Sequence, residues 1–198
     1  VPPAIGASPT SFSFTAQQGG SNPTNQPLSI SNTGGGTLSW TASETASWLT
    51  LSPGTGTGNG TVTLSAITGT LTPATYSGTV TLSGGTGVTS VTVPVSFTVT
   101  AAPVPPAIGA SPTSFSFAAT QGAANPTSQL LNISNPGGGT LTWSITDNQT
   151  WLTLNATSGT TTTETDSVTL SVNTNGLQAA THSATITVTA TGASNTPQ

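Results

Sequence analysis

Apolar and polar residues alternate in short runs along the whole chain, and a period of two residues predicts β-strands. In the first half, the runs expected to form strands are 11–16, 27–32, 37–42, 48–52, 61–66, 76–83 and 91–100. Glycine and proline separate these runs, and no apolar stripe with the 3.6-residue period of a helix survives between them. Short strands at this spacing, with turn signals between them, predict an all-β chain built as an antiparallel β-sandwich.

The alternation also predicts which side chains point into the core, because successive residues of a strand face opposite sides of the sheet. The last strand of the first half contains Pro94, which has no N–H to donate, so we expect an edge strand or a bulge there. The predicted inward residues are Phe12, Phe14, Leu28, Ile30, Leu38, Trp40, Val62, Leu64, Val80, Leu82, Val91, Val93, Val95, Phe97 and Val99.

The second half of the chain repeats the first. The sequence VPPAIGASPTSFSF at 1–14 recurs without change at 104–117, and the paired tryptophans of the first half recur in the second. We therefore expect two domains, 1–102 and 103–198, each of an ordinary domain size of about 100 residues. The proline-rich stretch AAPVPPAIGASP at 101–112 predicts an extended, semi-rigid linker.

The second repeat departs from the first in three places. His182 replaces Tyr76, and three residues are inserted in the threonine-rich stretch 160–166, which we expect to be a surface loop; the first repeat has the glycine-rich stretch 54–60 there, where we expect a turn. The closing segment VTSVTVPVSFTVT at 88–100 has no counterpart in the second repeat. A sandwich without its last strand has an open edge, so we expect a β-segment from a neighbouring domain or chain to complete it. A continuation of the same chain beyond its last residue is the alternative source of that segment.

Charge is almost absent. The chain has no Lys or Arg and a formal net charge of −4. Without cations it cannot neutralise phosphates, so we expect neither nucleic acid nor an anionic membrane surface as a partner. No apolar run approaches the roughly 18 residues of a membrane span, so no membrane insertion is expected. The absence of Cys, Met and sites for trypsin-like proteases fits an extracellular or cell-surface location.

One motif is specific enough to indicate a family. The pattern N-x-G-G-G-T-L-x-W followed by W-L-T-L occurs at 32–40 with 48–51, and again at 135–143 with 151–154. Together with the SPTSFSF start and the TPATYSGTVTLS segment, it resembles the BACON family of immunoglobulin-like modules across nearly all of both repeats. The resemblance implies two tandem immunoglobulin-like sandwiches of an extracellular, surface or phage protein. It also implies carbohydrate or mucin binding as an alternative function, although no binding motif of the family can be transferred to this chain.

Aromatic residues are the weak candidates for ligand binding. Trp40 and Trp143 are in phase with core leucines, so we expect them to be buried. Trp48 and Trp151 each open a strand after a loop, where partial exposure would let the ring stack on a sugar. We therefore name these two tryptophans as candidates and assign no binding residue.

The chain offers little else for chemistry. His182 is the only histidine and has no carboxylate beside it in sequence, so a structural or surface role is expected. Glu164 and Asp166 are too few for Ca²⁺, which takes six or more oxygen ligands, and no acid pair has a spacing suited to glycoside hydrolysis. We expect no catalytic residue, no metal and no cofactor, and so no enzyme. Four sequons, at Asn59, Asn132, Asn148 and Asn155, leave glycosylation open.

Two functions follow from the sequence. The first is a structural protein, a subunit or segment of an extracellular filament, stalk or tandem surface array, whose partners are copies of itself or adjacent repeats. It is favoured because natural sheet edges are protected by Lys, which this chain lacks, and because head-to-tail strand donation propagates into a filament. The alternative is a carbohydrate- or mucin-binding module of a larger secreted or phage protein, with glycans as partners.

Overall fold

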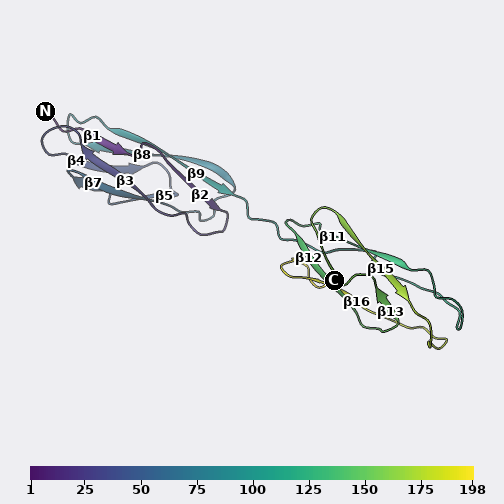
Figure 1. The fold of residues 1–198 in the computed structure, drawn as a ribbon. Helices are drawn as coiled ribbons and strands as arrows, with labels where there is room; N and C mark the ends of the chain where they lie inside the picture. Colours follow the sequence, from purple (N-terminus) through teal and green to yellow (C-terminus); the bar gives the residue numbers. More distant parts are fainter. The chain divides into compact units, whose positions relative to one another are not determined.

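The computed structural model describes all 198 residues, which form two compact units, Val1–Ala102 and Pro103–Gln198. Both units contain strands and loops only, and each is built from two sheets (Figure 1). The expected all-β fold of two tandem sandwiches is therefore confirmed. The structure contains no helix with the length and apolar character needed to cross a bilayer.

The first unit consists of a four-stranded and a five-stranded sheet. The four-stranded sheet has the order β1 (Ile5–Ser8), β3 (Gln26–Asn32), β7 (Gly60–Ala66) and β5 (Leu49–Ser52). The five-stranded sheet has the order β2 (Phe12–Gln17), β9 (Val91–Thr100), β8 (Ala74–Gly84), β4 (Ser39–Glu44) and β6 (Thr55–Thr57). All neighbours are antiparallel except β2 and β9, which run parallel along their whole shared length (Figure 1).

The second unit follows the same plan with fewer strands. Its larger sheet has the order β10 (Gly109–Ser111), β11 (Gln129–Ser134), β15 (Thr165–Val172) and β13 (Leu152–Leu154). Its smaller sheet has the order β14 (Ser158–Thr161), β12 (Leu141–Asp147) and β16 (Ile186–Ala190). The smaller sheet has no counterpart of β2 or β9, the two strands that close the five-stranded sheet of the first unit.

The core of the first unit lies where the alternation predicts it. Every predicted inward side chain is buried except Val91, which is half-buried at the start of β9. The central residue is Phe97, which is 0% exposed and packs edge-to-face with Phe14 and at a tilt against Trp48. The period-two pattern works here because each strand buries one face only.

Two short strands of the first unit, and their counterparts β10 and β14 in the second, were not predicted from the sequence. β1 precedes the first predicted strand, and β6 lies inside the glycine-rich stretch that was expected to be a turn. β6 passes directly over the indole ring of Trp40, and a Cβ atom added to Gly56 would collide with that ring. The glycine therefore has a packing reason, because only a residue without a side chain lets this strand approach the ring.

The prediction that β9 is an edge strand is wrong. β9 lies between β2 and β8 in the middle of its sheet. Pro94 is tolerated because the ladder to β2 begins only at the next residue, with the pair Phe12 and Val95. At Pro94 itself β9 is paired on the β8 side alone. Its other side has no partner strand there, so the missing N–H of the proline leaves no ladder hydrogen bond to β2 unmade.

The stretch expected to be a linker is, from Val104 onward, part of the second sandwich. β10 pairs with β11, and the carbonyl oxygen of Pro105 accepts a hydrogen bond of 3.0 Å from the N–H of Gly138. The side-chain oxygen of Asn135 accepts another of 3.0 Å from the N–H of Ala107. A Cβ atom on Gly137 would collide with the Pro105 carbonyl. The Asn-x-Gly-Gly-Gly motif thus binds the first residues of its own module through hydrogen bonds and close packing. The first unit has the same arrangement.

Candidate functional site: an open groove in the second sandwich

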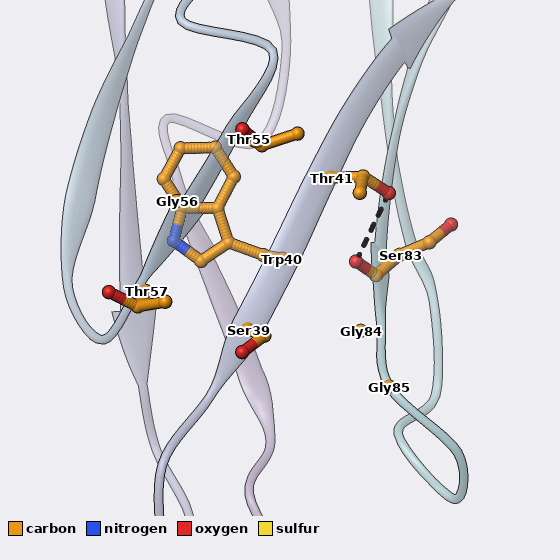
Figure 2. A pocket seen from close by; sticks show the side chains of 9 residues that line it. All are labelled: Ser39, Trp40, Thr41, Thr55, Gly56, Thr57, Ser83, Gly84 and Gly85. Carbon is orange, nitrogen blue, oxygen red and sulfur yellow. Dashed lines mark hydrogen bonds between the residues drawn. The ribbon is translucent and has the colours of Figure 1, made fainter.

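The first unit has a shallow hollow on its surface. It has a volume of about 430 Å³ and lies between β4, β6 and β8 (Figure 2). Serine, threonine and glycine line it, together with Trp40, whose ring points towards β6 and away from β8. The Trp40 side chain is only 3% exposed, and its indole N–H donates to the carbonyl oxygen of Gly58 at 3.2 Å. This ring cannot offer its face to a sugar.

The hollow in the second unit is a larger groove with a volume of about 1040 Å³. Its walls are the segments 112–121 and 177–186, and its floor contains core side chains of both sheets. By the repeat, 115–120 corresponds to β2, and 180–190 corresponds to β8. In the first unit the strand between β2 and β8 is β9. The groove therefore occupies the position that β9 fills in the first sandwich.

The walls of the groove are the counterparts of the segments that have β9 as their only sheet partner in the first unit. In the first unit, β2 pairs with β9 alone, and so do residues 74–79 of β8, whereas residues 80–84 pair with β4. In the second unit, the counterparts 115–120 and 180–185 are not strands. The remaining part, β16, keeps its pairing with β12. The two units thus differ in secondary structure at the segments whose backbone hydrogen bonds are made with β9 in the first unit.

The groove exposes side chains that are core residues in the first unit. Phe12 and Phe14 are 5% and 2% exposed, whereas their counterparts Phe115 and Phe117 are only half-buried. Trp48 is 8% exposed, whereas Trp151 is half-buried. Five further apolar side chains of the lining, Leu131, Leu152, Leu170, Val172 and Val188, are themselves buried, whereas Leu177 and Ile186 are half-buried. The groove thus leaves partly uncovered three aromatic rings whose counterparts are core residues in the first unit.

Trp151 has a different aromatic neighbour from its counterpart. The ring centroid of Trp48 lies 5.4 Å from that of Phe97 on β9. The ring of Trp151 instead meets His182 edge-to-face, with centroids 6.4 Å apart. Nε2 of His182 lies 3.0 Å from the carbonyl oxygen of Gln178, and in the first unit the Tyr76 hydroxyl donates to the carbonyl oxygen of Thr72 at 2.9 Å. His182 therefore replaces the tyrosine in a corner contact, which is a structural role.

The end of the chain marks one mouth of the groove. Gln198 and Val188 exchange two backbone hydrogen bonds, of 2.9 Å and 2.7 Å, as an antiparallel pair does. Val188 corresponds to Leu82, which pairs with Val91 at the start of β9. Gln198 thus takes the place of Val91. The turn before it is fixed by Asn195, whose side chain accepts from the N–H of Ile108 at 2.7 Å and donates to its carbonyl oxygen at 2.9 Å.

The stretch 160–166, expected to be a loop, is instead the end of β14, a short connection at 162–164 and the start of β15, and its two acidic residues have separate local roles. The Asp166 carboxylate accepts a hydrogen bond of 2.8 Å from the indole N–H of the buried Trp143. The Thr162 hydroxyl and the N–H of Thr163 donate to the Glu164 carboxylate at 2.7 Å and 3.0 Å, and these bonds lower the pKa of Glu164 to about 2. No three side chains of His, Cys, Asp or Glu come together in the structure.

The hydrogen bond from the Trp143 indole to Asp166 was not predicted from the sequence. In the first unit the same indole donates to a backbone carbonyl, and the residue at the position of Asp166 is Gly60. The available signal for this bond was the replacement of a glycine by an aspartate between two repeats that both keep the tryptophan. The sequon asparagines also have structural roles. Each accepts a hydrogen bond through its side-chain oxygen, at Asn59, Asn132, Asn148 and Asn155.

Several solved structures are distantly similar to the chain. A Bacteroides ovatus GH5 xyloglucanase in complex with a XXXG heptasaccharide is 18% identical, with a TM-score of 0.40 over 60% of this chain and 22% of that chain. A Porphyromonas gingivalis W83 protein of unknown function is 14% identical, with a TM-score of 0.43 over 94% and 92%. A mouse clustered protocadherin, PcdhgC3 EC1-3, is 14% identical, with a TM-score of 0.46 over 99% and 64%. The chain thus spans only 22% of the xyloglucanase, and likenesses at this level carry no argument about function.

No curated protein matches the chain. The family model of the viral BACON domain matches twice, at residues 4–98 and 107–197, which leaves only the ends of the two units uncovered. Both matches coincide with the repeats and with the two β-sandwiches of the structure. The chain therefore belongs to the viral BACON domain family, and it carries two tandem copies of this immunoglobulin-like module.

Proposed function

We propose that the chain is a non-enzymatic structural segment of an extracellular or cell-surface assembly, such as a filament, stalk or tandem array. In this proposal, a neighbouring domain or chain donates a β-segment that completes the second sandwich. The observation that supports it is the groove, which lies where β9 lies in the first sandwich and is walled by the segments that β9 would pair.

The chemistry of the donated segment follows from β9. Its inward side chains Val93, Val95, Phe97 and Val99 are all 2% exposed or less, and its outward positions are Thr, Ser and Pro. The groove matches this composition, because no Asp, Glu, Lys or Arg lines it and His182 is its only titratable side chain. The partner is therefore an extended, uncharged segment with an apolar side chain at every second position.

The energetic reason for donation is the burial of apolar surface. Each fully buried Val or Phe side chain contributes about 1.5–3 kcal/mol, so four such side chains contribute about 6–12 kcal/mol before the segment loses its conformational entropy. A segment held beside the groove by its own domain loses less entropy than a free peptide. A neighbour in the assembly is thus a better donor than a dissolved peptide.

Strand donation also explains how assembly would proceed. A donor on one molecule and a groove on the next make a head-to-tail contact, and such contacts continue into open chains unless a rotation closes them. The chain has no Lys and a net charge of −4, so little electrostatic repulsion opposes association. These features favour a polymer or array over an isolated monomer.

A peptide with the β9 sequence VTVPVSFTVT tests the proposal on the full chain. Two lysines are appended after its last residue for solubility, and hydrogen exchange is followed by mass spectrometry. We expect new protection at 115–120 and 180–185, because these segments gain backbone partners, and no change in the first unit. The control peptide has serine at the four inward positions. Equal exchange with both peptides would overturn the proposal.

Two further experiments address the source of the strand. In a fusion, the sequence TVPVSFTVT is appended directly after Gln198, which occupies the place of Val91. We expect this fusion to be monomeric and to reject the free peptide, because its groove is filled from within. Electron microscopy of the native assembly then distinguishes the sources. Fibres of regular width support donation by a neighbour, whereas dispersed monomers contradict it.

A carbohydrate- or mucin-binding module is the second candidate, and Trp151 is the observation that favours it. Its half-buried ring lines the groove, as do Gln121 and Gln178, whose side chains are joined by a hydrogen bond of 3.4 Å. Calorimetric titration with a panel of neutral oligosaccharides tests it. Glycan binding that disappears in Trp151→Ala and in the fusion with a filled groove would support this function, and no binding in the wild type would exclude it for the sugars used.

A further inference from the structure

We propose that the groove selects its donated strand by one aromatic side chain. That side chain occupies a subsite formed by Phe117, Trp151 and His182, and it fixes the register of the strand. This inference rests on the proposed function, because it describes the partner of the same groove. It goes further by naming the anchor residue and its position along the segment.

The subsite follows from the neighbours of Phe97 in the first unit. On β9, Phe97 pairs with Phe14 across the parallel ladder and with Tyr76 across the antiparallel one. Its ring centroid lies 6.4 Å from that of Phe14 and 5.4 Å from that of Trp48. The counterparts of these three residues are Phe117, His182 and Trp151.

All three counterparts line the groove of the second unit. Phe117 and Trp151 are half-buried, and His182 is exposed. The ring of Trp151 meets only the edge of His182, at 6.4 Å. An incoming ring can therefore contact Phe117 and Trp151 as Phe97 contacts their counterparts. Such aromatic pairs stabilise beyond the burial of their area.

The size of the anchor follows from the first unit. Phe97 is the largest side chain there that is fully buried, at 0% exposed. A smaller residue at this position leaves a cavity between the two sheets, and the loss of a buried ring is among the costliest core changes. Valine at the flanking inward positions fills less space, so the aromatic position is distinct from the other three.

The register follows from the pair formed by Gln198 and Val188. This pair takes the place of the pair Leu82 and Val91 in the first unit. On β9, Phe97 follows Val91 by six residues and pairs with Tyr76, whose counterpart is His182. The donated strand runs antiparallel to β16 and parallel to 115–120. Its aromatic side chain is therefore the sixth residue beyond the position of Gln198.

Peptide variants test the anchor by calorimetry on the full chain. Relative to the β9 peptide, we expect Phe97→Ala to weaken binding about 30-fold or more, as for a buried interface anchor, and Phe97→Leu to weaken it less. A peptide of unchanged composition, with Phe97 and Val95 exchanged, should bind no better than the alanine variant. If these variants bind within about threefold of the β9 peptide, the anchor is wrong while donation itself stands.

The protein side needs a separate test, because a groove variant can lower affinity merely by disturbing the fold. Trp151→Leu keeps apolar bulk and removes the ring. We expect it to reduce the ratio between the affinities of the Phe and Leu peptides, a readout that a general loss of stability does not change. An unchanged ratio would overturn the role of Trp151.

Disulfide capture tests the register, and the chain suits it because it contains no cysteine. In the first unit the hydroxyls of Thr75 and Thr98 face each other at 3.3 Å across β8 and β9. The counterpart of Thr75 is Thr181. We expect Thr181→Cys to form a disulfide with a peptide carrying Thr98→Cys, because directly opposed residues have the Cα separation that a disulfide needs.

The matched control is Ser183→Cys, two residues along the same wall, whose counterpart Ser77 pairs with Ser96. It should capture a peptide carrying Ser96→Cys and should react slowly with the peptide carrying Thr98→Cys. Inverted preferences would show a different register and overturn the inference. If no peptide binds or is captured at all, the proposed function fails together with it.

Discussion

Replacing Phe97 by alanine tests the premise that the last strand is essential to this sandwich. Phe97 is 0% exposed and contacts two other aromatic rings, so the substitution removes the centre of the core. Phe→Ala changes at such positions cost about 3–5 kcal/mol, the loss being the transfer free energy plus the cavity left behind. A domain of this size has a free energy of unfolding of only about 5–15 kcal/mol, so the first unit becomes marginal.

Urea unfolding of the full chain, followed by hydrogen exchange of each unit, measures this effect. With a slope of about 2 kcal/mol per molar urea, the unfolding midpoint of the first unit should fall by about 2 M. The second unit should unfold as before, because the substitution lies outside it. The matched control is Thr98→Ala on the outer face of the same strand, for which we expect a change within about 0.5 kcal/mol.

A loss below about 1 kcal/mol for Phe97→Ala would refute the reasoning. It would show that β9 adds little to the core of the complete sandwich. The groove of the second unit would then have no strong tendency to take up a similar strand. Both the donation and the aromatic anchor would lose their physical basis.

Three other predictions concern local features. Asp166→Ala should destabilise the second unit by about 1.5–3 kcal/mol, because a buried indole N–H loses a charged acceptor, and urea unfolding measures the change. Gly56→Ala should cost the first unit about 1–3 kcal/mol through collision with the tryptophan ring below, whereas Gly54→Ala, which meets nothing closer than 3.9 Å, should be nearly neutral in the same assay. The Glu164 pKa is lowered to about 2 from 4.5, so the stabilisation it gives is complete above pH 4.5 and disappears as the pH falls towards 2. A carbon-13 NMR titration should show this low pKa in the wild type and a rise towards 4.5 in Thr162→Ala, and an unshifted wild-type titration would contradict the assignment.

The alternation of side chains predicted the core because each strand of a sandwich buries one face. That is why residues as different as Leu28, Trp40 and Val95 were placed correctly. Short strands without apolar alternation gave no such signal. β6 consists of three residues around a glycine, and its pairing with β4 and the tryptophan ring beneath it, which explain this short strand, are visible only in the structure. The edge position inferred for β9 failed because a proline restricts one residue, not the whole strand.

The clearest limit of sequence reasoning lies in the identical start of the two repeats. The letters FSF at 12–14 begin β2 in the first unit, yet the same letters at 115–117 form no strand in the second. The local sequence is the same, so the difference comes from the partner, because β2 pairs with β9 alone. The absence of a strand counterpart was visible in the sequence. The loss of strand structure in two other segments could be predicted only by knowing which strands pair with β9 in the complete sheet.

The parallel pairing of β2 with β9 has a mechanical consequence. These strands lie near opposite ends of the first unit's chain, so tension applied between its ends pulls them along their length in opposite directions. The ladder then resists in shear, and its hydrogen bonds must break together rather than unzip one after another. The second unit has no such ladder by itself, so under a stretching force it should yield first and become as resistant as the first only when a strand is inserted.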